Sequence, residues 1–525
     1  MSTQIVPEER LREIVSYDPA TGEEVGRAPL RTPAEVEQAV RRARTAQPVW
    51  ASLSFRDRAR VMLKAREIML SEMDQIARLI SRETGKPVSE ALAMELVPTL
   101  DAMQYFARKS QGLLRQQKID IGQYGLMGRS SRIVFKPLGV VGIISPWNFP
   151  LGTPAAEVVM ALMAGNAVVL KPSELTPLIG LKIGEIFSRG GLAKGVLEIV
   201  TGDGSTGAAL IEARVDKIMF TGSVATGKRV AAAAAKHLTP VVLELGGKDA
   251  MVVLTDADIE MAARGAVWGA FANAGQACAS VERCYVQESI APEFISRVVA
   301  ETHLLKQNVG TKPDTDIGAM SNERQLGIVE EQVNDAVRHG AKVITGGQRA
   351  NGLGGFFYEP TVLTNVDHGM VVMREETFGP VLPVMTFQTE DEAVKLANDC
   401  AYGLTASVWT KNTSRGRRIG ERIEAGTVMV NEVLYTHGIA QTPWGGVKDS
   451  GYGRTHGRMG LLELVTPLHI HVNRFGFLPD LWWFRYSSKA DRLFRDLARH
   501  FTTGSILRTA RLLPQIIRRV LETRQ

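Results

Sequence analysis

Short apolar segments that do not alternate with polar residues recur through the middle of the chain. Ala-rich stretches with helical periodicity separate them, at 154–164, 177–189 and 224–237. Runs of Val, Ile and Leu joined by helices predict parallel strands covered on both faces, as in a doubly wound α/β sheet. The first five runs are "GVVGIIS" (139–145), "NAVVLKPS" (166–173), "GVLEIVTG" (195–202), "KIMFTGS" (217–223) and "PVVLELGG" (240–247).

A second series of apolar runs follows and predicts another α/β unit. No fixed-period repeat or low-complexity linker separates the two series, so we place their boundary near residue 247. The predicted fold class is α/β, with a Rossmann-like doubly wound domain followed by a second α/β domain. The runs of this second series are 249–254, 283–287, 341–347, 381–387, 405–410 and 427–432.

The first 120 residues predict a hairpin followed by helices. "YDPATGEEVG" (17–26) combines turn residues with extended flanks. A capping box at Thr32 and Glu35 starts a helix that reaches about Ala46. Helical periodicity then continues from Ser54 up to Gly85.

Composition is that of a globular protein with more than one domain. The chain has 525 residues, a length that exceeds what one hydrophobic core supports. Its residues are 45% hydrophobic and 22% charged, as in ordinary globular proteins. Three cysteines favour a reducing compartment over a disulfide framework. The start "MSTQIVPEERLREIV" has no secretory signal, the end "LETRQ" has no prenylation cysteine, and no apolar run is long enough to span a membrane. We therefore expect a cytoplasmic protein.

The net charge of +6 lies entirely near the C-terminus. Residues 475–525 contain ten Lys or Arg and four Asp or Glu, so the first 474 residues are neutral overall. This distribution argues against a nucleic-acid-binding body and predicts a basic extension with its own partner.

Polar residues stand where the predicted strands end, which is where open α/β sheets bind ligands. Asn148 in "SPWNFP" offers an amide donor in a stiff turn, although a capping Asn would give the same pattern. Lys171 and Glu174 in "KPSE" form either a surface ion pair or a ribose-binding pair. A carboxylate at this point would repel a 2′-phosphate, which favours NAD over NADP.

The next two strands end in a glycine loop and a carboxylate. In "FTGSVATG", Gly222 and Gly227 frame a helix start whose N–H groups could face a pyrophosphate, although many such loops are simply turns. Glu244 in "LELGG" interrupts a strand that otherwise reads as buried. Burial would raise its pKa toward that of a general base, unless an ion pair neutralises it.

The segment "GQACASVERC" (275–284) contains two of the three cysteines. Cys278 alone would be read as apolar packing. Together with Glu244, Asn148 and a dinucleotide loop it completes a set for oxidising a carbonyl through a covalent adduct. Cys284 and Cys400 have no such neighbours and are interpreted as structural, and the spacing predicts no metal site.

Over residues 10–474 the chain resembles the NAD(P)-dependent aldehyde dehydrogenase superfamily. Seven segments match in order and at compatible spacing, which makes the resemblance specific. They are "PWNFP", "KPSE", "FTGSVATG", "LELGGKDAMVV", "GQACAS", "EETFGPVLPV" and "WGGVKDSGYGR".

The resemblance implies a role for each member of the predicted catalytic set. Cys278 would attack the aldehyde to give a thiohemiacetal, and hydride loss would leave a thioester. The Asn148 amide and the Cys278 N–H would form the oxyanion hole, each donor contributing ~3 kcal/mol. Glu244 would activate the water that releases the carboxylic acid.

The resemblance also implies the contacts to the cofactor, expected to be NAD rather than NADP. Lys171 and Glu174 match the adenosine-ribose pair, whereas Glu376 and Phe378 match the pair at the nicotinamide end. The full set of expected cofactor-binding residues is Trp147, Lys171, Ser173, Glu174, Gly204, Phe220, Gly222, Ser223, Gly227, Leu245, Glu376 and Phe378.

The family's organisation predicts the domains and the oligomer. Residues 1–118 and 138–246 would form the NAD-binding domain and 247–450 the catalytic domain. Residues 119–137 and 465–474 match strands that protrude and pair across subunits, which implies a homodimer or homotetramer.

The chain departs from the family at one position near "GYGR". Many members place a Glu there that is discussed as a proton relay, whereas this chain has Thr455 and His456, so we assign no relay.

Two other functions are compatible with the same fold. One is a coenzyme A-acylating dehydrogenase, a branch that often lacks the base matched by Glu244, and the other is a non-catalytic scaffold.

Residues 475–525 extend past the usual end of the family's fold. An aromatic cluster, "LWWFRY", precedes a helical stripe of Leu493, Phe494, Leu497 and Phe501. A second stripe follows Gly504, with Pro514 as a predicted kink and most of the arginines opposite. Basic amphipathic helices with aromatic anchors suit an anionic membrane surface, and a medium- or long-chain aldehyde would then be the natural substrate. The alternative is packing on the protein itself or on another subunit. The second stripe is Leu513, Ile517, Val520 and Leu521, and the arginines placed opposite it are Arg508, Arg511, Arg518 and Arg519.

Overall fold

The computed structural model describes residues 13–503 and 505–523. The chain divides into two compact units, the larger formed by residues 1–113 and 137–464 and the smaller by 114–136 and 465–525. The expectations about a leader segment and about "LETRQ" concern chain ends of which residues 1–12, 524 and 525 lie outside the described part.

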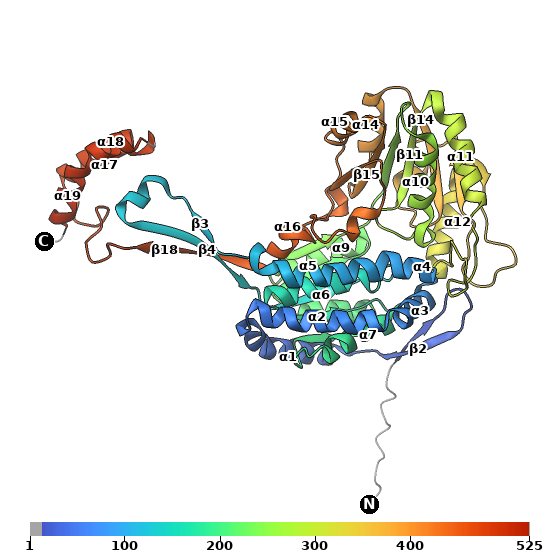
Figure 1. The fold of residues 1–525 in the computed structure, drawn as a ribbon, viewed down its shortest axis with the longest axis horizontal. Helices are drawn as coiled ribbons and strands as arrows, with labels where there is room; N and C mark the ends of the chain where they lie inside the picture. Colours follow the sequence, from blue (N-terminus) through green and yellow to red (C-terminus); the bar gives the residue numbers. More distant parts are fainter. Residues whose placement is uncertain (1–12, 504, 524–525) are drawn as a thin grey trace, which may run out of the picture. The chain divides into compact units, whose positions relative to one another are not determined.

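The larger unit begins with the predicted hairpin and helices (Figure 1). Strands β1 and β2 pair antiparallel, and the Thr32 and Glu35 side chains form the predicted capping box at the start of α1. The helix predicted from Ser54 to Gly85 divides at Glu72, whose backbone leaves helical geometry. Ion pairs from Glu72 to Lys182 and Arg189 accompany this break. The elements are β1 (Glu13–Tyr17), β2 (Glu24–Pro29), α1 (Pro33–Ser52), α2 (Phe55–Ser71), α3 (Met73–Thr84), α4 (Val88–Glu90) and α5 (Val97–Leu113).

A six-stranded sheet in the order β17-β9-β8-β5-β6-β7 follows. Its strands run parallel except at the edge, where β17 pairs antiparallel with β9. Helices α1, α8 and α9 contribute apolar side chains to the core on one face. The elements are β5 (Val140–Ile144), α6 (Gly152–Ala164), β6 (Ala167–Lys171), α7 (Pro177–Arg189), β7 (Leu197–Ile199), α8 (Gly204–Glu212), β8 (Lys217–Thr221), α9 (Val224–Ala235), β9 (Val241–Glu244) and β17 (Gly451–Tyr452).

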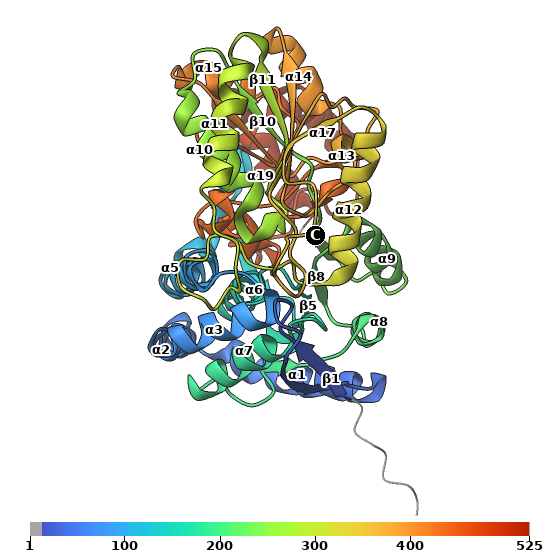
Figure 2. The ribbon, with the colours of Figure 1, turned by 90° about the vertical axis from the view of Figure 1, so that its right-hand side faces the viewer.

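The larger unit also contains a seven-stranded sheet in the order β12-β13-β14-β11-β10-β15-β16. Helices α10 and α11 lie on one side of it and α12 and α13 on the other (Figure 2). Strand β13 was not predicted, and β12 pairs antiparallel with it. The elements are β10 (Asp249–Val253), α10 (Ile259–Phe271), β11 (Val281–Gln287), α11 (Ala291–His303), α12 (Glu323–Arg338), β12 (Lys342–Thr345), β13 (Thr361–Thr364), α13 (Val371–Arg374), β14 (Val381–Phe387), α14 (Glu390–Asn398), β15 (Thr405–Trp409), α15 (Thr413–Gly420), β16 (Thr427–Val430) and α16 (Gly457–Leu462).

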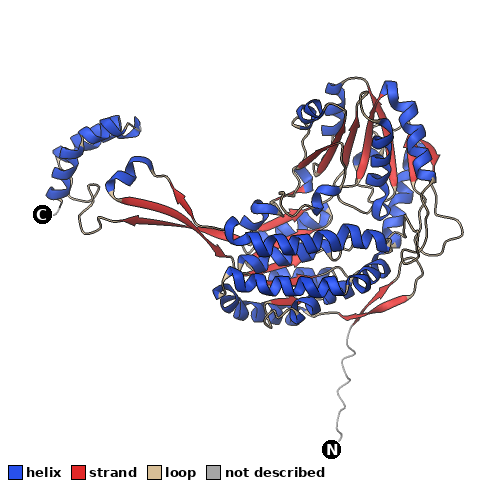
Figure 3. Ribbon diagram, viewed as in Figure 1, coloured by secondary structure: helices blue, strands red, loops and turns tan. Residues whose placement is uncertain are grey.

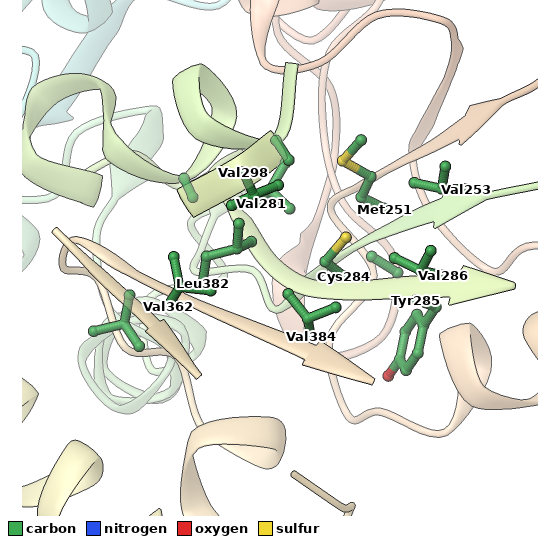
Figure 4. Close-up of a cluster of buried hydrophobic side chains, with 14 of the residues drawn as sticks. Met251, Val253, Val281, Cys284, Tyr285, Val286, Val298, Val362, Leu382 and Val384 are labelled. Atoms are coloured by element: carbon green, nitrogen blue, oxygen red, sulfur yellow. The ribbon is translucent and has the colours of Figure 1, made fainter. Parts of the chain in front are cut away.

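Strands of this second sheet are buried under both helix layers, which explains their continuous apolar sequences. Figure 4 shows side chains of β10, β11, β13 and β14 packed with Val298 of α11. Cys284 is fully buried in this core, so it serves as a small apolar side chain. Parallel sheets flanked by helices confirm the predicted α/β class (Figure 3).

The smaller unit is a three-stranded sheet in the order β18-β4-β3 with C-terminal helices. Strand β18 is an edge strand and most of its residues are exposed. The stripe of α17 is buried within this unit, against Leu481 and Leu512. The elements are β3 (Gln117–Ile119), β4 (Arg129–Pro137), β18 (Val465–Asn473), α17 (Ser488–His500), α18 (Ile506–Arg511) and α19 (Leu513–Glu522).

Two expectations about this extension are wrong. Pro514 does not kink a helix but lies in the first turn of α19, where its missing N–H leaves no hydrogen bond unmade. Arg519 does not lie on an exposed polar face: it is 4% exposed and donates to the carbonyl oxygens of Leu481 and Trp483. None of the described helices is both long enough and apolar enough to cross a bilayer.

Candidate active site

The loop that carries Cys278 connects α10 to β11 and has an unusual backbone. Asn273 and Ala274 have φ angles of 54° and 52°, in the left-handed region that non-glycine residues rarely adopt. The Asn273 N–H donates to both carboxyl oxygens of Glu90, at 2.9 and 3.0 Å. Such strained conformations persist where surrounding contacts enforce them, so the position of Cys278 is set by the rest of the fold.

Side-chain amides join this loop to the "PWNFP" loop. Asn148 is 5% exposed, and its Nδ2 donates to the Gln276 carbonyl oxygen at 2.9 Å. Asn273 Nδ2 donates to that same oxygen and to the Asn148 carbonyl oxygen. The buried Lys86 ammonium donates to the Asn148 carbonyl oxygen at 2.6 Å and pairs with Glu95 at 2.7 Å. The predicted amide donor is therefore held beside the cysteine loop.

Glu244 is the last residue of β9. The loop that follows it, residues 245–248 (the Glu244 loop), contacts the cysteine loop directly. A Cβ at Gly247 would come within 2.5 Å of the Cys278 carbonyl oxygen, so only glycine allows this approach. Cys278 packs against Leu404 and Trp444. The Trp444 side chain also lowers the pKa of Glu244, although burial outweighs this effect. The predicted thiol and base thus share one region.

Burial dominates the electrostatics of both groups. Glu244 is 6% exposed, and neither of its carboxyl oxygens has a hydrogen-bond partner among the described residues. Its pKa is raised well above the usual value by burial and by the charge of Glu157, which Arg454 only partly counters. Burial, reinforced by nearby carboxylates, also raises the pKa of the Cys278 thiol. The resting thiol is therefore protonated at neutral pH.

Residues expected to contact the adenosine end surround the ends of β6 and β8. Lys171 is buried and pairs with the exposed Glu174 at 3.1 Å, and Ser173 accepts from the Leu175 N–H. Ser223 caps α9 by accepting from the Thr226 N–H. Gly204 begins α8, which packs on α9. The Gly222 N–H donates to the Glu244 carbonyl oxygen. A Cβ at Gly222 would lie 2.7 Å from Phe220 and one at Gly227 would lie 2.5 Å from Leu245, so both loop positions require glycine.

Residues expected at the nicotinamide end form a second group. Trp147 and Phe378 make an edge-to-face contact with ring centroids 5.4 Å apart. Glu376 accepts from the Gly247 N–H at 3.1 Å, and burial raises its pKa to about 8. The N–H of Phe378 donates to Glu282, which is itself paired with the buried Lys248 at 2.5 Å.

These residues fit a dinucleotide. A Cβ at Gly246 would lie 2.3 Å from the Glu376 carboxylate, so only glycine allows this carboxylate to lie against the loop that follows β9. Ser223 is the N-cap of the 12-residue helix α9, whose first N–H groups can donate hydrogen bonds to the oxygens of a pyrophosphate. The exposed Glu174 carboxylate is free to accept from hydroxyl groups on its outer side.

Thr455 and His456 are not exposed to solvent, so they do not connect the site to solvent as a proton relay would. Both are buried, and the Thr455 hydroxyl lies 2.9 Å from His456 Nδ1. Burial lowers the pKa of His456 to about 3 and that of the neighbouring His437 to about 4, so both rings are neutral.

Sequence reasoning missed the residues that hold the site together. Asn273, Gln276, Lys86 and Trp444 were not singled out, although Gln276 and Trp444 lie inside the quoted motifs "GQACAS" and "WGGVKDSGYGR". A polar side chain next to a predicted nucleophile was the available signal. Lys86 has no comparable signal, because the Asn148 carbonyl oxygen that it contacts is 62 residues away in the sequence.

Comparisons with known proteins agree with this arrangement. A model of the aldehyde dehydrogenase family matches residues 5–469. The "4,4'-diapolycopene aldehyde oxidase" of Methylomonas sp is 40% identical over 482 residues, covering 92% of this chain and 90% of that protein. A "putative succinate-semialdehyde dehydrogenase [NADP(+)] 2" of Mycobacterium tuberculosis is 40% identical over 470 residues, covering 88% and 90%.

Solved structures give the same result. The NAD⁺ complex of an aldehyde dehydrogenase from Bacillus cereus superposes with a TM-score of 0.84 at 33% identity, covering 88% of this chain and 94% of that one. The family match over most of the chain and the shared fold lead to one conclusion: this protein is a member of the aldehyde dehydrogenase family.

Proposed function

We propose that the protein oxidises an aldehyde to the carboxylic acid through a covalent adduct on Cys278. The observation that carries this proposal is the joining of three loops: Asn148 is bonded to the cysteine loop, and Gly247 of the Glu244 loop lies against Cys278. A nucleophile, an amide donor and a buried carboxylate in one region suit acyl transfer through sulfur.

Each residue has one task in this reaction. The partly exposed Cys278 thiol loses its proton to water as its sulfur bonds to the aldehyde carbon, and the Asn148 amide and the Cys278 N–H stabilise the oxygen that gains negative charge. NAD(P)⁺ is the family's cofactor, and when bound it supplies the acceptor for the hydride that the adduct loses. Glu244 then takes a proton from water as the water oxygen bonds to the acyl carbon. The C–S bond breaks and the acid is released.

We also propose NAD rather than NADP as the preferred cofactor. Glu174 is held by Lys171 at the end of β6 with an exposed carboxylate, and a 2′-phosphate at that point would meet like charge. The adenosine and nicotinamide residues belong, in this proposal, to a cofactor domain of 1–118 and 138–246 and a catalytic domain of 247–450.

An aldehyde panel tests both proposals. With linear aldehydes of increasing chain length, NAD is expected to give a kcat/KM at least tenfold higher than NADP, and the acid should equal the NADH formed without coenzyme A. Absorbance of the reduced cofactor and quantification of the acid measure this. Product that appears only with coenzyme A would support the acylating alternative, and no turnover with any aldehyde would support the scaffold alternative.

The edge strand β18 supports a homodimer or homotetramer. It pairs with β4 on one side, and eight of its nine residues are half-buried or exposed. Exposed strand edges readily pair with another chain. We propose that residues 119–137 and 465–474 form this contact.

The smaller unit supports a peripheral site on an anionic membrane, and thus an apolar, medium- or long-chain aldehyde. Trp483, Phe484 and Leu507 are 60%, 78% and 80% exposed, and exposed arginines lie along the same segment. Aromatic anchors and basic residues together favour anionic lipid, at about 1 kcal/mol for each basic residue. The exposed arginines are Arg485, Arg492, Arg495, Arg499, Arg508, Arg511 and Arg518.

Vesicle sedimentation tests this partner. The parent protein is expected to sediment with phosphatidylglycerol vesicles and not with phosphatidylcholine vesicles, and salt should weaken binding. Changing Trp483, Phe484 and Leu507 together to Ser should reduce the bound fraction at least tenfold. Leu238→Ser, at a 90% exposed position of the larger unit, is the matched control. Equal sedimentation of the parent and the triple variant would overturn the proposal.

A further inference from the structure

A short segment between α3 and α5, residues 86–95, contacts both the cysteine loop and the "PWNFP" loop. This bridging segment contains the single turn α4 and most of a π-helix, η1 (Ala91–Leu96). The Val88 N–H donates to the Gly310 carbonyl oxygen, and a Cβ at Gly310 would lie 2.2 Å from the Lys86 carbonyl oxygen. These close contacts fix the bridging segment against its neighbours.

The π-helical turn places two acidic side chains on one side of the bridging segment. In a π-helix each N–H donates to the carbonyl oxygen five residues earlier, so residues five apart lie nearly above one another. The Val97 N–H follows this pattern and donates to the Leu92 carbonyl oxygen. Glu90 and Glu95 are five residues apart, at the N-cap and within the turn. An α-helix, with 3.6 residues per turn, would direct them to different sides.

Glu90 holds the cysteine loop. It is half-buried, and both of its carboxyl oxygens accept from the Asn273 N–H, at 2.9 and 3.0 Å. The Asn273 side chain donates to the Gln276 carbonyl oxygen at 3.0 Å, and that oxygen also accepts from the Asn148 amide at 2.9 Å. Because the backbone of Asn273 and Ala274 is left-handed, and therefore unfavourable, the loop needs this carboxylate to stay in place.

Glu95 holds the loop that carries Asn148. One of its carboxyl oxygens accepts from the Lys86 ammonium at 2.7 Å, and the same ammonium donates to the Asn148 carbonyl oxygen at 2.6 Å. The other oxygen accepts from the N–H groups of Leu151 and Gly152, at 2.8 and 3.1 Å. The side chains of Lys86 and Glu95 are fully buried. A buried polar network in which each member is bonded is rigid, so this loop has a fixed place relative to the bridging segment.

We propose that the bridging segment is a clamp for the two reacting loops. Its Glu90 and Glu95 are positioning residues that fix how far the Asn148 amide lies from the nucleophile. This inference rests on the proposed function. One N–H of the Asn148 amide is bound to the Gln276 carbonyl oxygen, and the second serves the oxygen of the thiohemiacetal. That oxygen gains its charge only as the carbon–sulfur bond forms, so the clamp acts on kcat and not on aldehyde binding.

The kinetics of Glu90→Gln test the clamp. Gln has nearly the same shape, but its amide nitrogen is a donor and cannot accept from the Asn273 N–H. The cysteine loop should then leave its strained conformation. We expect kcat and kcat/KM to fall together by a factor on the order of 10², the cost of displacing a reacting group by about 1 Å, with KM changed less than about threefold. Initial rates of NADH formation over a range of aldehyde concentrations measure both.

Glycine at position 274 should rescue this variant, because glycine adopts the left-handed region without strain. In Glu90→Gln combined with Ala274→Gly, kcat is expected to return to within about threefold of that of Ala274→Gly alone. The matched control is Glu83→Gln. Glu83 is a buried carboxylate that also accepts from two backbone N–H groups, those of Leu178 and Ile179 on α7, at 3.0 and 2.8 Å. This control should keep the parent kcat, whereas a loss equal to that of Glu90→Gln would overturn the inference.

Hydrogen exchange of the peptide 272–278 measures the clamp without the reaction. Exchange at the Asn273 N–H should accelerate about tenfold in Glu90→Gln, as expected when one hydrogen bond is lost. Unchanged exchange, or an unchanged kcat in folded Glu90→Gln, would overturn the inference. A parent protein that oxidises no aldehyde, although Glu90→Gln exchanges faster, would refute the proposed function and leave the clamp standing. If Glu90→Gln does not fold, Glu90→Asp, whose carboxylate is one methylene shorter, replaces it with the same expected results.

Discussion

Cys278→Ala is expected to abolish aldehyde oxidation, with kcat reduced by a factor on the order of 10⁴ or more, because the covalent route is lost with the sulfur. Cofactor binding should persist, since the Lys171–Glu174 pair and the Glu376 loop do not depend on the thiol. Initial rates of NADH formation and NAD titration by fluorescence measure the two effects.

The control for this result is Cys400→Ala, which removes a half-buried thiol outside the proposed site. It should retain parent activity. Alkylation gives a second measure: because burial raises the pKa of Cys278, its reaction with iodoacetamide in the cofactor-free protein should accelerate as the pH rises through the alkaline range. Substantial turnover by Cys278→Ala would refute the nucleophile.

Glu244→Gln is expected to stop the reaction at the thioester. NADH should appear in a burst of about one equivalent per chain, followed by a steady rate reduced ~10²- to 10⁴-fold, the usual loss when a general base is removed. Mass spectrometry of the quenched protein should show the acyl group on the peptide that contains Cys278. Release of acid at the parent rate, without a burst, would refute the base.

The same substitution should change stability in a pH-dependent way. The folded-state pKa of Glu244 lies above its unfolded value, so in the parent this group costs folding free energy as the pH rises from the unfolded toward the folded pKa. Gln carries no such cost. Glu244→Gln should therefore gain stability over the parent at pH 8 and gain little at pH 4, as urea unfolding can measure.

Local sequence patterns predicted most of the strands and helices, but they missed one strand and one helix break. The strand 381–387 and the helix 177–189 have the predicted bounds, because each apolar pattern is long and ends at clear boundaries. Strand β13 was missed, since "TVLT" has only four residues between loops. The division at Glu72 is accompanied by ion pairs to α7, more than 100 residues away, which no local pattern contains.

The site shows the same division between local and distant information. Chemistry-bearing residues stood at the ends of predicted strands, which is a local feature. The Asn273–Gln276–Asn148 amide network could not be predicted, because it joins loops 125 or more residues apart.

The residues around Cys278 are far apart in the sequence, so they come together only late in synthesis of the chain. Asn148 and Gln276 are 128 residues apart, and Glu244 and Gly451 pair only after β17 has been synthesised and added to the sheet. A growing polypeptide therefore contains Cys278 well before it contains Leu404 and Trp444, against which that residue packs in the finished fold. During synthesis that sulfur is an ordinary thiol, and catalytic power arises only with the finished tertiary structure.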